Sequence, residues 1–333
     1  MKPMKSKTRP LEGQIAVVAG ATRGAGRGIA RMLGEAGAVV YCTGRSARGG
    51  PPPTGVYAGR RETIDETADM VAAHGGVGIP VRVDHTAVEE VDALFARVRR
   101  EHGRLDVLVN DISEGEHHDW QPFWKVSLEK GFRALRQGVY SHIITSRAAA
   151  PLMIERRRGL IVEVGDGDTL DYRGTLFFDL VKVTVSRLAY AMAEELRPHG
   201  VAALAITPGF LRSEMMLDHF GVTEANWRDG AKKDPNFVAS ETSCFVGRAI
   251  AALAADPRLL EKSGGLYSSW RLAREYGLTD LDGSQPDIGA QIDFDAMYAR
   301  SAKTAFRWTI GARPKAAVSR RRVSARRGSR PRA

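Results

Sequence analysis

Cysteine and long apolar runs are scarce in this 333-residue chain. Its two cysteines, Cys42 and Cys244, lie far apart and match no spacing of a metal site or a redox motif. No stretch reaches the 18 or more consecutive apolar residues of a membrane span, and the basic first ten residues lack the apolar core of a secretory signal. These absences predict a reduced, cytoplasmic setting.

Acidic residues are absent from both ends of the chain. Residues 1–10 carry four lysines or arginines, and residues 315–333 carry Lys315 and seven arginines. Without these twelve charges, the formal net charge of +10 becomes about −2 for residues 11–314. We therefore expect two basic, disordered tails beside a nearly neutral globular part. No aromatic residues interleave the C-terminal arginines, so contact of this tail with nucleic acid or an anionic membrane is disfavoured.

Between the tails, short β-branched runs alternate with segments of helical periodicity. This alternation predicts an α/β, doubly wound Rossmann fold with a parallel sheet of about seven strands. We expect a single domain over residues 11–270, with a mobile lid over 210–237, a C-terminal extension over 271–314 and the tails 1–10 and 315–333. The expected strands are 14–18, 38–43, 77–83, 105–110, 160–164, 201–206 and 265–267, and the longer expected helices are 62–74, 88–102, 137–154 and 175–197.

Glycines cluster directly after the first expected strand and before a segment with helical periodicity. A strand, a tight glycine turn and a helix let the backbone approach a pyrophosphate, which binds the free N–H groups at the helix N-terminus. We therefore expect this loop to bind a dinucleotide through Gly20, Thr22, Arg23, Gly24, Ala25 and Gly26.

An acidic residue is missing where the second expected strand ends. A Rossmann site that prefers NAD needs an acid there for the ribose 2′-hydroxyl, whereas this strand ends in Cys42-Thr43-Gly44-Arg45-Ser46. Arg45, next to Ser46, offers a planar fork of donors suited to a 2′-phosphate, and Arg23 in the glycine loop can reach the same place. The pattern favours NADP(H).

With these features, the chain resembles the short-chain dehydrogenases/reductases (SDR) over about residues 11–270. Gly20-x3-Gly24-x-Gly26 is similar to their cofactor loop, Leu108-Val109-Asn110 to the start of an Asn-Asn-Ala-Gly strand, and Pro208-Gly209 with Ser213 to a Pro-Gly-x3-Thr segment. The resemblance implies a small-molecule substrate and a homodimer or homotetramer paired through helices 137–154 and 175–197. It adds these cofactor-binding residues: Asp84, His85, Asn110, Lys182, Pro208, Gly209 and Ser213.

The C-terminal part is similar, more narrowly, to the subgroup of dehydrogenase/reductase SDR family member 1. The similarity rests on Ser263-Gly264-Gly265, Arg274-Glu275-Tyr276-Gly277-Leu278 and Asp280-Leu281-Asp282-Gly283.

The same resemblance implies a catalytic Ser, a Tyr-x3-Lys pair and a helix Asn. In that set the tyrosine donates a proton to a carbonyl, and the lysine lowers the pKa of the tyrosine. Lys182 is present, but Phe178 stands four residues before it and has no proton to give. Asp166 aligns with the serine, Gly138 with the helix Asn, and Asp111 with the second Asn of the strand motif.

Three hypotheses stay open, and we favour them in this order. Another acid, Asp166 or Tyr172, replaces the tyrosine in an NADP(H)-dependent oxidoreductase that acts on an unknown carbonyl or alcohol. Alternatively, the chain is a catalytically impaired NADP(H)-binding homologue with a sensing or structural role. A third class is a structural or nucleic-acid-associated protein that depends on the basic tail. The candidate catalytic positions are Lys182, Asp166, Phe178 and Tyr172.

Acids and histidines also gather over residues 114–119, where a solvated or substrate-lining loop is favoured. Adjacent histidines in a loop lack the i, i+4 geometry of a helical metal site, so no metal is expected. The nearby Trp120, Phe123 and Trp124, and Trp227 in the lid, are expected to line a substrate pocket or to pack under the lid.

Overall fold

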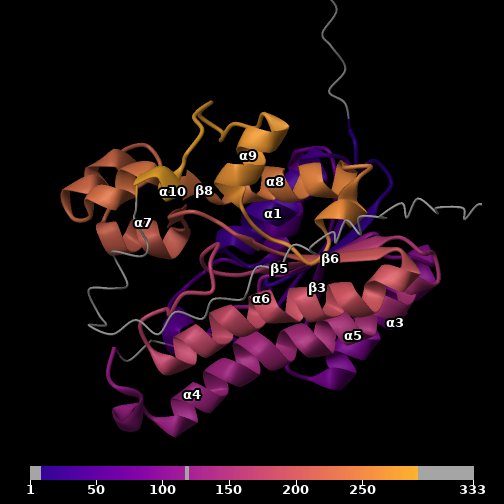
Figure 1. The fold of residues 1–333 in the computed structure, drawn as a ribbon, viewed down its shortest axis with the longest axis horizontal. Helices are drawn as coiled ribbons and strands as arrows, with labels where there is room; N and C mark the ends of the chain where they lie inside the picture. Colours follow the sequence, from indigo (N-terminus) through magenta and orange to yellow (C-terminus); the bar gives the residue numbers. More distant parts are fainter. Residues whose placement is uncertain (1–8, 117–119, 292–333) are drawn as a thin grey trace, which may run out of the picture.

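A seven-stranded parallel sheet forms the centre of the molecule (Figure 1). The computed structural model describes residues 9–116 and 120–291. The strand order is β3-β2-β1-β4-β5-β6-β9, so the doubly wound Rossmann fold is confirmed, and no predicted strand end is more than two residues from its observed position. The strands are β1 (Ile15–Ala19), β2 (Val39–Gly44), β3 (Val77–Arg82), β4 (Val107–Asn110), β5 (Gly159–Val164), β6 (Val201–Thr207) and β9 (Leu266–Ser268).

Helices cover both faces of this sheet (Figure 1). One buried cluster joins the sheet to α1, α2, α8 and α9, and a second joins it to α3, α5 and α6. The helices are α1 (Gly24–Glu35), α2 (Ile64–Ala73), α3 (Val88–His102), α4 (Leu128–Leu135), α5 (Ser141–Ile154), α6 (Leu176–Leu196), α7 (Glu214–Phe220), α8 (Ser243–Ala255), α9 (Ser269–Tyr276) and α10 (Ile288–Gln291). None of the helices in the described part of the chain is long and apolar enough to cross a membrane.

The side chains of β1 and β3 explain why β1 lies inside the sheet and β3 at its edge. Every residue of β1 is buried, as expected for a strand that pairs on one edge with β2 and on the other with β4. β3 contains Pro80, which cannot donate to a ladder, and β3 accordingly lies at an edge of the sheet.

The helix expected over 137–154 begins earlier than its sequence pattern suggested. Ser127 caps α4 by accepting a hydrogen bond from the Lys130 N–H, and a π-helical turn over Arg136–Tyr140 joins α4 to α5. The expected start at Gln137 therefore falls inside this turn, because the extra residue of a π-turn shifts the helical period.

The segment expected to form a lid, residues 210–237, has a small core of its own. Phe220, Trp227 and Phe237 are buried together against Phe210, so Trp227 packs inside the lid. Its strand β7 (Leu211–Arg212) pairs with β8 (Glu241–Thr242).

Residues beyond 270 continue the domain. Helix α9 crosses the boundary expected after residue 270, and Asp280 and Ile288 are 1% and 3% exposed. The domain therefore extends to at least residue 291, and residues 1–8 of the expected N-terminal tail, residues 292–314 of the expected extension and the tail 315–333 lie outside the described residues.

Candidate functional site

A cavity of about 830 Å³ opens at the carboxyl ends of β1, β4, β5 and β6. In a doubly wound sheet, ligands bind at this edge, where the strand order reverses between β1 and β4. The predicted site residues that line the cavity are Gly20, Thr22, Arg23, Gly24, Ala25, Arg45, Ser46, Asp84, His85, Asp166, Lys182, Pro208, Gly209 and Ser213. Gly26, Asn110, Tyr172 and Phe178 are not among its lining residues.

The glycine loop is shaped by close backbone contacts. Gly20 has φ +94°, and a Cβ there would lie 2.2 Å from the Asp111 carbonyl oxygen. A Cβ on Gly26 would lie 2.3 Å from the Gly20 carbonyl oxygen, so Gly26 packs behind the loop. Both positions therefore require glycine, as a phosphate-binding turn between a strand and a helix does.

The two arginines expected at a 2′-phosphate have different surroundings. Arg45 is exposed at the cavity wall. The Arg23 guanidinium stacks 4.5 Å from the Tyr57 ring centre, and its Nε lies 3.4 Å from the Glu62 carboxylate, while its buried Nη2 has no hydrogen-bond partner. Arg82, at the end of β3, also lines the cavity, and the sequence analysis did not single it out.

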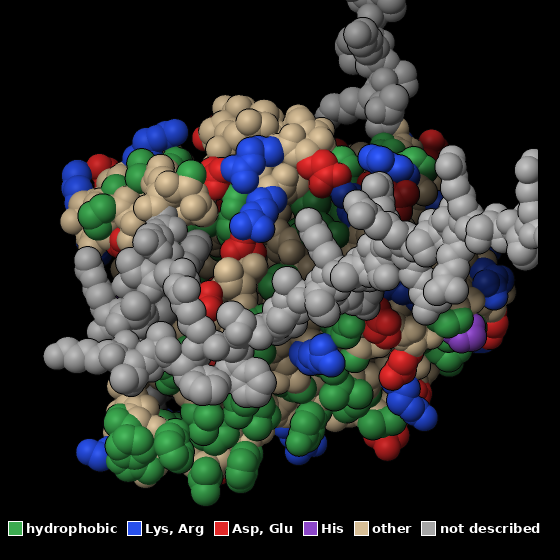
Figure 2. Space-filling view, viewed as in Figure 1, with side chains coloured by type: hydrophobic (Ala, Val, Ile, Leu, Met, Phe, Trp, Pro, Cys, Tyr) green, Lys and Arg blue, Asp and Glu red, His purple; other side chains and the backbone are tan. Residues whose placement is uncertain are grey.

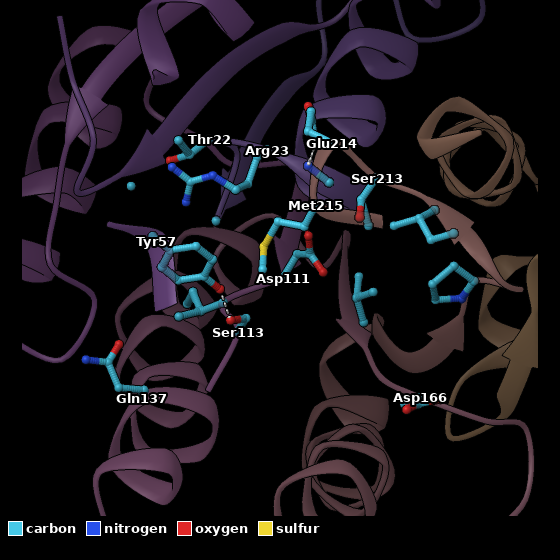
Figure 3. Close-up of a pocket in the computed structure, with 18 of the residues that line it drawn as sticks. Thr22, Arg23, Tyr57, Asp111, Ser113, Gln137, Asp166, Ser213, Glu214 and Met215 are labelled. Atoms are coloured by element: carbon cyan, nitrogen blue, oxygen red, sulfur yellow. Dashed lines mark hydrogen bonds between the residues drawn. The ribbon is translucent and has the colours of Figure 1, made fainter. Parts of the chain in front are cut away.

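A strap of residues 51–57 crosses the cavity wall. Pro51, Pro52, Pro53, Thr54 and Tyr57 line the cavity, and the Tyr57 hydroxyl is hydrogen-bonded to the Ser113 hydroxyl on the loop after β4 (Figure 3). The sequence does not predict this strap, because a Tyr–Ser contact 56 residues apart leaves no local pattern.

Acids at the strand ends are held in different charge states. Burial raises the pKa of Asp84, but hydrogen bonds from Thr86 and the nearby charge of Arg45 outweigh it and hold that pKa below its usual range. Burial raises the pKa of Asp111 to about 7, against the opposing effects of the Gly26 N–H and the Lys182 charge. Asp111 therefore faces the cavity largely protonated at mildly acidic pH.

Asn110 and His85 belong to a buried polar network. Asn110 is fully buried and donates from Nδ2 to Glu163 (2.7 Å) and Ser146 (2.8 Å). The His85 ring lies between the Thr43 and Thr145 hydroxyls, and burial together with the charge of His142 lowers its pKa to about 3. Asn110 therefore lies behind the residues that line the cavity and holds Glu163 and Ser146 by hydrogen bonds. The His85 ring is neutral at physiological pH.

His142 lies in the same buried network. Its Nδ1 contacts the Glu163 carboxylate at 2.5 Å and its Nε2 contacts the Ile112 carbonyl oxygen at 3.0 Å. An ionised carboxylate and a carbonyl oxygen only accept hydrogen bonds, so this arrangement favours the protonated ring, in which both nitrogens donate. Burial lowers the pKa of His142, but Glu163 and the carbonyl outweigh burial and raise it.

Lys182 lies at the base of the cavity with carboxylates around it. Its Nζ is 3.1 Å from the Glu114 carboxylate. Burial lowers the pKa of Lys182, but the charges of Glu114, Asp166 and Asp111 outweigh it and raise that pKa. Lys182 is therefore held charged, and Glu114, which was expected in a solvated or substrate-lining loop, is its ion-pair partner.

Phe178 lies beside Lys182 and outside the lining of the cavity. It precedes Lys182 by one helical turn on α6, and the Lys182 Nζ lies 5.3 Å from its ring centre. Its ring also lies 6.4 Å from that of Trp120. Trp120, Phe123 and Trp124 are 57–71% exposed, and none of them lines the cavity.

The two substitute proton donors differ in position. Asp166, on the loop after β5, lines the cavity across from Asp111 (Figure 3). Tyr172 is 48% exposed, and burial and the charge of Asp179 raise its pKa. Of the described residues that line the cavity, Tyr57 is the single tyrosine. The structure brings Asp166 to the cavity and leaves Tyr172 outside it.

The described residues contain no group of three histidines, cysteines, aspartates or glutamates that could hold a metal ion. Within the 114–119 loop, Glu114 and Glu116 instead pair with Lys182 and Arg133. His117, His118 and Asp119 lie outside the described residues.

The strand order, the glycine turn and the crevice beside it define a dinucleotide-binding protein of the Rossmann class. The short chain dehydrogenase family model matches residues 53–220, and mouse dehydrogenase/reductase SDR family member 1 is 37% identical over 281 residues, which cover 82% of this chain and 85% of the relative. The chain belongs to the short-chain dehydrogenase/reductase family, whose members are oxidoreductases that bind NAD or NADP.

Other relatives are more distant. The 3-oxoacyl-acyl-carrier-protein reductase FabG of Vibrio harveyi is 28% identical, over 77% of this chain and 98% of the relative. A crystal structure of a short chain dehydrogenase from Mycobacterium thermoresistibile has a TM-score of 0.68 at 23% identity, covering 84% of this chain and 92% of the other. This last similarity supports the fold.

Proposed function

We propose that this protein is an NADP(H)-dependent oxidoreductase that interconverts a carbonyl compound and an alcohol. The observation that carries the proposal is the cavity that joins the glycine turn to Lys182 along one edge of the sheet. The residues present fit a dinucleotide, because glycines 20 and 26 leave no room for a Cβ and a buried nitrogen of Arg23 lacks a partner. A bound reduced nicotinamide supplies a hydride to the carbonyl carbon.

The protein's own residues then stabilise and protonate the carbonyl oxygen. The charged Lys182 favours the oxyanion that develops there, and Glu114 holds the lysine in place. Asp166 is the proposed proton donor, because it shares the cavity with Lys182 and Tyr172 does not. Asp166 takes a proton from solvent and passes it to the carbonyl oxygen, which returns Asp166 to its carboxylate form beside Lys182.

NADP(H) is the proposed cofactor because arginines surround the end of β2. Arg45, Arg82 and Arg23 line the cavity near the turn, and β2 ends without an acid. A 2′-phosphate would bind these guanidinium groups.

Calorimetric titration with both cofactors tests this proposal. We expect NADPH to bind at least about tenfold more tightly than NADH, which corresponds to about 1.4 kcal/mol. Arg45→Ala should narrow the difference in affinity between the two cofactors by weakening the binding of NADPH. Arg48→Ala is the matched control, since Arg48 is exposed, pairs with Asp69 and does not line the cavity. Equal affinities, or tighter NADH, would overturn the preference.

Phe178 supports a second candidate function, an NADP(H)-binding homologue with impaired catalysis and a sensing or structural role. A phenyl ring beside Lys182 leaves that lysine without a phenol to polarise. Tight NADPH binding without turnover across a panel of ketones, aldehydes and alcohols would favour this candidate.

We further propose that the protein is cytoplasmic and forms a homodimer or homotetramer through α4, α5 and α6. Hydrophobic side chains gather at the α4 end of the molecule (Figure 2). Leu128, Phe132, Tyr140 and Ile143 are 44–61% exposed on this helical layer, and such a patch commonly marks an interface.

A further inference from the structure

The N-terminus of α1 is capped by a residue from the lid. The residue before this helix, Arg23, makes no side-chain cap. The Gly24 N–H instead donates to the Glu214 carboxylate at 2.8 Å, across 190 residues of sequence. The other oxygen of Glu214 lies 3.5 Å from the Arg27 guanidinium, so both carboxylate oxygens have partners on α1.

This capped N-terminus is also the place where the proposed cofactor would put its diphosphate. The free N–H groups and dipole of a helix that follows a glycine turn bind phosphate groups. Gly24, Ala25 and Glu214 all line the cavity, and Glu214 lies on the side of Ser213 that faces the turn (Figure 3). A carboxylate and a diphosphate carry the same sign of charge and need the same donor.

Glu214 is built into the lid in a way that couples it to the cavity. It is the first residue of α7, and Ser213, which caps α7 by accepting from the Met216 N–H, also lines the cavity. Arg27 does not depend on Glu214 for its position, because its guanidinium also contacts Glu66 at 2.9 Å and the Thr22 carbonyl oxygen at 3.0 Å. Displacing Glu214 therefore breaks the contact between α7 and α1 and leaves Arg27 with its other partners on α2 and the glycine turn.

We propose that Glu214 sets the affinity of the dinucleotide site: its carboxylate occupies the diphosphate position on α1, and it must leave before the cofactor binds. The inference rests on the proposed dinucleotide binding and adds a competing group from the lid. Binding of the cofactor then breaks the contact of α7 with α1, and re-formation of the Glu214 contact favours release of the cofactor.

Calorimetry with NADPH and with inorganic pyrophosphate tests this competition in wild type and in Glu214→Gln. The amide keeps the size of the side chain and removes its charge. We expect both ligands to bind Glu214→Gln about tenfold more tightly, within the usual range of coupling between two sites. Glu214→Ala should also bind both more tightly, and Asp229→Asn is the matched control, since Asp229 lies in the lid and pairs with Lys232.

The outcomes separate this inference from the proposed function. Wild-type binding of NADPH with unchanged or weaker binding in both Glu214 variants would overturn the competition and leave the cofactor site standing. Failure of wild type and all variants to bind either NADPH or NADH would overturn the proposed function and the inference with it. An equal gain in affinity for NADPH and pyrophosphate in Asp229→Asn would show a general effect of lid charge and would also overturn the competition.

Discussion

Phe178 and Asp166 are the two positions that the sequence resemblance aligns with the catalytic tyrosine and serine of the family, and changes at both test that alignment. Phe178→Tyr adds a hydroxyl to a ring whose centre lies 5.3 Å from the Lys182 Nζ. A positioned general acid is worth about 10²–10⁴ in rate, so we expect the wild type to reduce simple ketones and aldehydes slowly. Phe178→Tyr alone should raise kcat/KM only partly, because Asp166 still lacks a hydroxyl. Phe178→Tyr with Asp166→Ser should give more than either change alone, measured as kcat/KM for NADPH oxidation.

Phe123→Tyr is the matched control, since it adds the same hydroxyl to an exposed ring that does not line the cavity. Brisk wild-type turnover that survives both Asp166→Asn and Tyr172→Phe would contradict the prediction, because the proton would then come from another group.

Asp111 makes stability depend on pH. Its pKa is about 7 in the folded protein and 3.8 in the unfolded chain, so the folded state holds this proton more tightly. The stabilisation that Asp111 adds to the free energy of unfolding is fully present below about pH 4 and is lost as the pH rises through 7. Between pH 4.5 and 8, the free energy of unfolding of the wild type should fall by about 2–4 kcal/mol more than that of Asp111→Asn. Urea unfolding at several pH values measures this difference.

The variant keeps an oxygen that can accept from the Gly26 N–H, so its fold is a fair comparison. Parallel pH profiles for the two proteins would show that Asp111 is already ionised in the folded state.

Sequence reasoning found the residues whose role depends on near neighbours in the chain. Gly20 needs its positive φ, Gly26 approaches the Gly20 carbonyl oxygen, and a Phe four residues before Lys182 on one helix gives the observed pair. It gave no role to Glu214 or Tyr57 and recorded Asp111 only as a departure from a motif. Their partners lie 190, 56 and about 85 residues away, and such pairings have no local signature.

At the scale of elements, the strands were predicted closely from short apolar, β-branched runs, because strands buried on both faces of a parallel sheet consist of such runs. Helical periodicity placed the helix start wrongly at Gln137, because the π-turn interrupts the 3.6-residue period there. The preceding helix α4 has an amphipathic pattern of its own. The lid was expected to be mobile from its composition. Its buried Phe220, Trp227 and Phe237 pack into one unit, which composition alone does not reveal.

Over the whole sequence, the net positive charge comes from residues 1–10 and 315–333. Residues 315–333 hold eight positive charges, no acids and no apolar periodicity, so they are not expected to contribute to the core. Deleting them should leave the melting temperature and the Kd for NADPH nearly unchanged, as measured by calorimetry. A large loss of either would mean that this segment docks on the domain or across a subunit interface.

The contact between Glu214 and Gly24 also bears on the order in which the chain folds. During synthesis, β1 and α1 emerge long before residue 214, so the first turn of α1 has to form without its cap. The sheet is complete only when β9 pairs with β6, still later in the chain. The N-terminal strands can therefore collapse early, whereas the end of α1 beside the cavity acquires its final partner only when the C-terminal third arrives.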